Sequence, residues 1–167
     1  PVDLAKAYFY PGIGKSDLTF DLIAPDESAS TSSYTVTVAA AQMYKWQTTE
    51  IPGEATGVTI TAKDAGLFIN EMAFYDKYGN RVESQIVDTF NEEGASPGNF
   101  EALFDEPTMV DGKPNYMTEM YFDEKYHART AFGHLHGMAP YENSHPPLGK
   151  VFIMLGIWIF GMNPFGW

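Results

Sequence analysis

The first part of the chain alternates apolar and polar residues with a period of two, which is typical of β-strands that bury one face. This alternation, or an enrichment in β-branched and aromatic residues, predicts strands at residues 18–23, 33–38, 57–62 and 67–75. Turn signals separate them, at residues 10–12, 28–33, 51–53 and 76–80. We therefore expect a mainly β fold, an antiparallel, jelly-roll-like β-sandwich, in this region.

The remainder of the chain lacks this alternation and predicts two C-terminal helices. Residues 123–136 contain no proline, and the next residue, Gly137, is a common stop for a helix because glycine adopts the left-handed conformation without strain. A double proline ending at Pro147 then favours a new helix, whose first backbone amides have no partner in any case. We expect this second helix to run to Gly161.

The change of pattern divides the chain into two expected domains, a β-sandwich over residues 1–115 and a helical region over residues 116–167. Two segments rich in acidic residues, glycine and proline, 91–99 and 105–114, predict a long loop and a linker. The sequence starts at Pro1 and stops directly after an apolar run. We interpret it as a piece of a longer protein.

Charge separates the same two regions. The 167 residues carry 10 basic and 22 acidic side chains, a net charge of −12, and 18 of the acidic ones precede residue 116. The resulting field repels nucleic-acid phosphates, so we expect no nucleic-acid partner. The chain has no cysteine, which excludes a disulfide framework, a thiolate metal site and a thiol nucleophile.

The last seventeen residues, 151–167, carry no charge and include Trp158 and Trp167. Two glycines and an Asn-Pro pair interrupt them, and a membrane-spanning helix needs about 20 mostly apolar residues. Two interpretations stay open: a helix buried in a protein core, or a helix lying in the membrane interface. We favour the interface, because residues 151–160 are apolar on every face and would otherwise need complete burial.

Polar residues of the first expected helix form a candidate site. Asp123, His127 and His134 are four and seven residues apart, which places them on one helix face. The turn that follows could return His145 and Lys150 to the same surface. A carboxylate beside cations suits glycosyl transfer from a phospho-sugar, because the carboxylate accepts the proton of an attacking hydroxyl while cations stabilise the departing phosphate. The alternative is that the acidic residues only stabilise the helix N-terminus and the histidines are solvated.

Metal binding and serine hydrolysis are weaker alternatives. The three histidines of this helix offer ring nitrogens and its first two acidic residues offer oxygens, but the side chains of His134 and His136 point about 200° apart. We assign no metal ligands, and a divalent metal stays open as a cofactor. No Gly-x-Ser-x-Gly turn exists, and we expect the side chains of the neighbours Ser144 and His145 to diverge.

Several short motifs after residue 116 carry a resemblance to a known family. They include the acidic pair at residues 123–124, a His-x-His-Gly sequence at 134–137, a Pro-Tyr-Glu sequence at 140–142 and a His-Pro-Pro-Leu-Gly-Lys sequence at 145–150. This region closely resembles the first extracytoplasmic loop of the protein O-mannosyltransferases, membrane enzymes of the GT-C fold that use polyprenyl-phosphate sugars. The resemblance covers residues 116–167, roughly a third of the chain.

The resemblance implies a role for each matching residue. Asp123 would be the general base that activates the acceptor hydroxyl, with Glu124 supporting the site. Phosphate or substrate would be bound by His145, Lys150, Arg129 and His127. The implied partners are a polyprenyl-phosphate-linked sugar donor, with mannose as the sugar, and a hydroxyl acceptor on a protein or glycan. Both helices would lie on the extracytoplasmic face of the membrane.

The long first region departs from this family, whose members have only a short stretch before the acidic pair, so an inserted β domain is implied. Its strand order is similar to that of discoidin or galactose-binding-like jelly rolls. Three of its aromatic residues, Tyr10, Tyr44 and Trp46, could stack on sugar rings or pack in the core. Three functions stay open: a glycosyltransferase fragment that is inactive alone, a membrane-tethered carbohydrate- or protein-binding module without catalysis, and a spacer.

Overall fold

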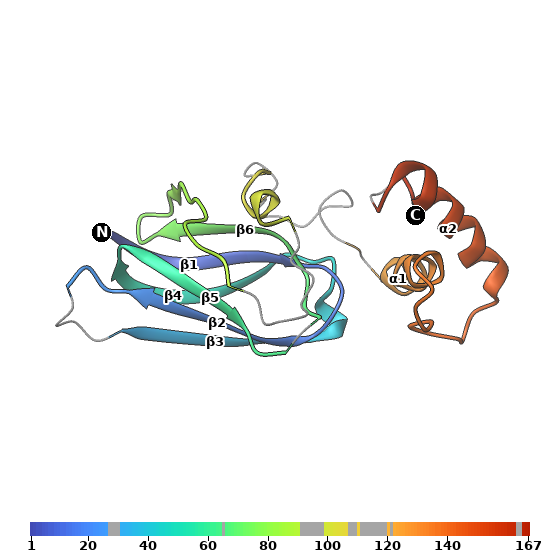
Figure 1. Ribbon diagram of the computed structural model, residues 1–167, viewed down its shortest axis with the longest axis horizontal. Helices are drawn as coiled ribbons and strands as arrows, with labels where there is room; N and C mark the ends of the chain where they lie inside the picture. The colour runs from blue at the N-terminus through green and yellow to red at the C-terminus, as the bar shows by residue number, and fades with distance from the viewer. Residues whose placement is uncertain are drawn as a thin grey trace. The chain divides into compact units, whose positions relative to one another are not determined.

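The computed structural model describes residues 1–26, 31–64, 66–90, 99–106, 110, 120, 122–162 and 165–167. The chain forms two compact units, Pro1–Pro114 and Asn115–Trp167, which are described separately (Figure 1). Most of the predicted loops at 91–99 and 105–114, and part of the turn predicted at 28–33, lie outside the described residues.

The first unit contains two antiparallel sheets (Figure 1). One has the strand order β4-β1-β6-β7, formed by Gln47–Ala55, Val2–Pro11, Ile69–Asp76 and Arg81–Val82. The other has the order β3-β2-β5, formed by Ser32–Val38, Ser16–Ile23 and Gly57–Ala62. The predicted fold class, antiparallel β-structure followed by two helices, is confirmed.

One apolar core is formed by residues of both sheets. In β2 burial alternates strictly, so that Leu18, Phe20 and Leu22 are buried while the residues between them are not. Phe20 contacts Phe9 of β1 and Phe74 of β6, with ring centroids 6.1 and 6.4 Å apart. Contacts between aromatic rings of the two sheets add to the free energy gained from burial alone.

Strands β1 and β4 were not predicted from the sequence. The turn signal at residues 51–53 does not break the chain, because β4 runs through it. The pairing of β4 with β1 is irregular between Leu4 and Lys6, and Pro52 lies at this bulge. Proline is tolerated there, since β4 is an edge strand and a bulge needs no regular ladder hydrogen bond.

The aromatic residues considered for sugar stacking pack against the protein. Tyr44 is 6% exposed, which favours the core alternative for this residue. Tyr10 and Trp46 are half-buried and pack on each other, with ring centroids 5.3 Å apart. The mutual contact occupies part of the Tyr10 and Trp46 rings. Tyr44 is buried and therefore offers no exposed ring on which a sugar could stack.

A buried acid lies in β6. Glu71 is 4% exposed, and both its carboxylate oxygens are buried without a hydrogen bond of standard geometry among the described residues. Burial raises the pKa of Glu71 to about 7, with a further contribution from the neighbouring charges of Asp105 and Glu106, while the backbone amides of Glu106 and Met72 offset part of this shift. As the pH rises, the Glu71 carboxyl of the unfolded chain therefore loses its proton at a lower pH than the same group in the folded unit.

We expect this acid to make the stability of the first unit depend on pH. Because the folded-state pKa lies above the ordinary value of 4.5, its stabilising contribution is complete below that pH and is lost as the pH rises through about 7. Glu71→Gln should therefore raise the free energy of unfolding more at pH 8 than at pH 5, by about 1–3 kcal/mol. Urea unfolding at both pH values measures this, with the exposed Glu83→Gln as control. The same pH dependence in wild type and Glu71→Gln would contradict the prediction.

The second unit contains α1, Glu124–Leu135, and α2, Pro147–Phe160, which pack against each other (Figure 1). The predicted stop of α1 at Gly137 takes the Schellman form: its φ is +66°, its N–H donates to His134 O, and Met138 N–H donates to Gly133 O. Pro147 starts α2 as predicted. No helix in the described part of the chain is long and apolar enough to cross a membrane.

Candidate functional site

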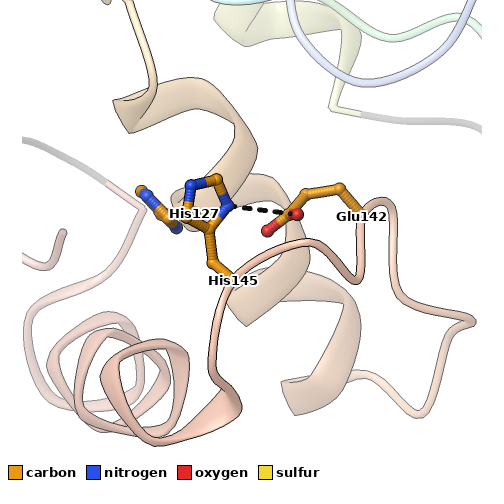
Figure 2. A group of neighbouring side chains, drawn as sticks. All are labelled: His127, Glu142 and His145. Atoms are coloured by element: carbon orange, nitrogen blue, oxygen red, sulfur yellow. Dashed lines mark hydrogen bonds and ion pairs between the residues drawn. The ribbon is translucent and has the colours of Figure 1, made fainter.

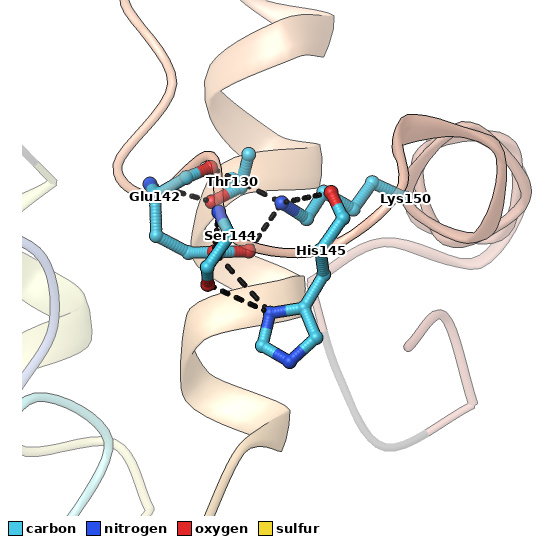
Figure 3. A network of polar contacts seen from close by, with 5 residues as sticks. All are labelled: Thr130, Glu142, Ser144, His145 and Lys150. Atoms are coloured by element: carbon cyan, nitrogen blue, oxygen red, sulfur yellow. Dashed lines mark hydrogen bonds and ion pairs between the residues drawn. The ribbon is translucent and has the colours of Figure 1, made fainter.

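Glu142, in the loop between the two helices, is the centre of a polar network (Figure 3). One carboxylate oxygen, Oε1, forms an ion pair with Lys150 Nζ. The other, Oε2, accepts hydrogen bonds from Ser144 N at 2.8 Å and from Ser144 Oγ at 2.5 Å. These contacts, the one from Lys150 first, hold the pKa of Glu142 well below its usual range. The carboxylate is therefore ionised at any physiological pH.

Lys150 lies in the first turn of α2 and is 3% exposed. Besides the Glu142 carboxylate, its Nζ contacts the backbone oxygens of Glu142 at 3.1 Å and His145 at 3.4 Å. Three oxygens thus surround an ammonium group that has three donors. Through these contacts Lys150 fixes the loop to α2.

The loop brings two histidines together (Figure 2). His145 Nδ1 lies 3.3 Å from Glu142 Oε2 and 3.1 Å from Ser144 Oγ. The ring of His127, on α1, meets the ring of His145 edge to face, with centroids 4.7 Å apart. The expectation that Ser144 and His145 diverge is wrong, because both side chains approach the same Glu142 oxygen. They form no hydrolase triad, since a triad needs serine and acid on opposite ring nitrogens.

Asp123 precedes α1, and its side chain makes no capping hydrogen bond to the helix. Helix capping therefore does not explain this residue. Together with His127 it lines a hollow of about 440 Å³, whose walls are Phe122, Asp123, Glu124, His127, Ala128, Ile153 and Trp167. Glu124 has a local role, because its carboxylate accepts a hydrogen bond of 2.7 Å from the amide of Phe122. His127 lines the hollow and also contacts the ring of His145, which belongs to the polar network.

Trp167 reaches this hollow because the chain end folds back closely onto α2. A Cβ built on Gly156 would lie 2.5 Å from the backbone oxygen of Gly166, so only glycine allows this approach. The end of the sequence thus contributes an aromatic wall beside Asp123.

Arg129 lies on α1 and packs against the loop that follows this helix. Its guanidinium carbon is 5.9 Å from the centre of the Tyr141 ring, and Tyr141 in turn stacks on Tyr126. One guanidinium nitrogen, Nη1, is buried without a hydrogen-bond partner among the described residues. This contact attaches the loop to α1 and leaves one donor of Arg129 to be satisfied by another group.

Sequence reasoning did not single out Glu142 or Ser144 as site residues. Their signal was a polar stretch between two prolines, ending at His145. Of the three helix histidines considered for a metal, His134 and His136 are exposed. The third, His127, has metal-ligating atoms in reach of those of Glu142 and His145.

Comparison with known proteins finds a relative for part of the chain. The chain is 39% identical over 62 residues to the polyprenol-phosphate-mannose–protein mannosyltransferase of Mycolicibacterium smegmatis, in two strains. Part of the chain is thus related to a mannosyltransferase. The match covers 34% of this chain and 12% of the relative, so the chain corresponds to a small portion of that protein. No family model and no solved structure matches.

Proposed function

We propose that this chain is part of a membrane glycosyltransferase that transfers a sugar, mannose by preference, from a polyprenyl-phosphate carrier to a hydroxyl of a protein or glycan. The similarity over 62 residues to an enzyme named for this donor carries the proposal. The carboxylate of Asp123 supports it, because it makes no capping hydrogen bond and lines a hollow together with the imidazole of His127. The first unit is then an insertion of the β class within that enzyme.

In this mechanism Asp123 accepts the proton of the acceptor hydroxyl while the hydroxyl oxygen attacks the anomeric carbon of the sugar. The bond between that carbon and the phosphate oxygen breaks, and the phosphate leaves with the electron pair and needs no proton. In this proposal His145, His127 and Arg129 stabilise the phosphate charge. Lys150 acts as a positioning residue, because it holds Glu142 and the loop that carries His145.

The surface of α2 supports a location at the membrane. Its exposed apolar side chains are Leu148, Val151, Phe152, Leu155, Trp158, Ile159 and Phe160. A helix of 14 residues is about 21 Å long, shorter than a bilayer core of about 30 Å. We therefore place α2 in the interface on the extracytoplasmic side, with Trp158, which is 70% exposed, at headgroup depth.

Vesicle binding tests this placement. Replacing Phe152 and Trp158 together by serine should weaken binding of the 167-residue chain to phosphatidylcholine vesicles at least tenfold, because burying each aromatic ring contributes about 2 kcal/mol. Neutral lipid avoids repulsion by the net charge of −12. Sedimentation with vesicles measures the bound fraction. The control is Phe90→Ser, which removes a ring that is 91% exposed in the first unit. Equal binding by the double variant and the wild type would contradict the placement.

Transfer by the complete membrane protein tests the function. Membranes that contain it should move labelled mannose from polyprenyl-phosphate-mannose to a hydroxyl-bearing acceptor peptide. We expect none from the 167-residue chain alone, because the rest of the enzyme would hold the lipid. Complete protein that leaves every lipid-linked sugar untouched, or vigorous transfer by the chain alone, would overturn the proposal.

A further inference from the structure

Ligand atoms of three side chains converge in the loop between α1 and α2 (Figure 2). A ring nitrogen of His127, a ring nitrogen of His145 and a carboxylate oxygen of Glu142 all lie within 4.8 Å of one another. His145 Nδ1 and Glu142 Oε2 are 3.3 Å apart. Two donors bound tetrahedrally to one Zn²⁺ ion at about 2.0–2.1 Å are separated by about 3.3 Å. The separation of this pair therefore already fits one ion, and a small rotation of His127 would complete the set.

We propose that His127, Glu142 and His145 bind a divalent transition-metal ion, Zn²⁺ by preference. Two imidazoles and one carboxylate form a donor set that Zn²⁺ uses where a fourth position stays open for water or substrate. Mg²⁺ and Ca²⁺ prefer oxygen ligands throughout, so the two nitrogen donors favour the later transition metals. The site differs from the helical His134 and His136 pair, whose side chains cannot share an ion.

The neighbouring residues hold this set in place before an ion binds. Lys150 fixes Glu142 Oε1, and Ser144 contacts Oε2 (Figure 3). Thr130 of α1, which is fully buried, accepts a hydrogen bond of 3.3 Å from the Glu142 amide and so links the loop to the helix that carries His127. Outer contacts of this kind orient the ligands, and losing one typically costs about 10–100-fold in metal affinity.

The charges of the site suggest what the open position takes. Because Lys150 already neutralises Glu142, the bound ion keeps its positive charge, and an anionic oxygen is the favoured fourth ligand. If the proposed function holds, this ligand is the phosphate of the sugar carrier, and this extension alone rests on that function. The metal site itself rests on the three side chains.

Calorimetric titration of the untagged 167-residue chain with ZnCl₂, in buffer without phosphate, tests the site. We expect one ion per chain with a micromolar or lower Kd, and at least tenfold weaker binding by His127→Ala and by His145→Ala. The matched control is His134→Ala, an exposed histidine of the same helix, which should leave the Kd unchanged. Circular dichroism of each variant checks folding, and either ligand variant suffices if the other fails to fold.

Folded wild-type chain that binds no stoichiometric Zn²⁺ would overturn the site, as would unchanged binding by a folded ligand variant or an equal loss in His134→Ala. These failures would leave the proposed transfer function standing, because Asp123 is not among the three ligands. Conversely, a Zn²⁺ site in a protein that transfers no sugar would separate the metal from that function.

Discussion

Asp123→Asn in the complete membrane protein is expected to lower the rate of sugar transfer at least 10²-fold. Asparagine keeps the size and polarity of the side chain but cannot accept a proton, and a positioned general base contributes about 10²–10⁴-fold to a rate. The Asp123 side chain makes no capping hydrogen bond, so the change should leave folding intact. The measurement is the initial rate of mannose transfer from saturating polyprenyl-phosphate-mannose, in membranes matched for the amount of enzyme.

The neighbouring acid provides the control for this experiment. Glu124→Gln keeps a side-chain oxygen that can accept the hydrogen bond from the Phe122 amide, so we expect it to lower the rate less than tenfold. A fall in kcat with KM unchanged would locate the effect of Asp123→Asn in the transition state rather than in donor binding. Near-normal transfer by Asp123→Asn would remove this residue from the role of base.

The sequence predicts best the strands whose alternation is regular and free of internal turn signals. β2, β3 and β5 begin and end within two residues of the predicted limits. In β2 the buried residues recur at every second position, and in β3 partly buried and exposed positions alternate. In β1 the buried residues Leu4, Ala7 and Phe9 are spaced by three and then two. The bulge between Leu4 and Lys6 causes this change of spacing, and it also accommodates Pro52 in β4. The bulge therefore conceals β1 from a pattern of period two, whereas burial in β4 alternates regularly and the turn signal at residues 51–53 conceals that strand.

The two helices follow from local signals, since a double proline and a glycine with positive φ determine their ends. The site between them does not. Glu142 and Lys150 are eight residues apart and meet only because the loop folds back on α1, which no helical or strand spacing encodes. Lys150 therefore has the sequence signature of a surface cation although it is buried. The metal-ligating set has the same origin, because His127 lies on a helix and its partners lie in the loop.

Lys150→Met is expected to destabilise the second unit by about 2–4 kcal/mol, because it leaves the ionised carboxylate of Glu142, whose side chain is 15% exposed, without its cation. Methionine retains most of the buried aliphatic chain, so lost packing contributes little. Urea unfolding of the 167-residue chain measures the change by tryptophan fluorescence. A Trp46→Phe background removes the signal of the first unit, so that Trp158 and Trp167 report on the second.

The double variant Lys150→Met with Glu142→Gln separates the ion pair from other effects. Glu142→Gln alone leaves the ammonium of Lys150, which is 3% exposed, without a carboxylate and should also destabilise strongly. If the two charges mainly compensate each other, the double variant is more stable than the sum of the single changes predicts, by at least about 1 kcal/mol. If the destabilisations caused by the two single changes instead simply add, neither charge stabilises the other, which would contradict a compensating ion pair.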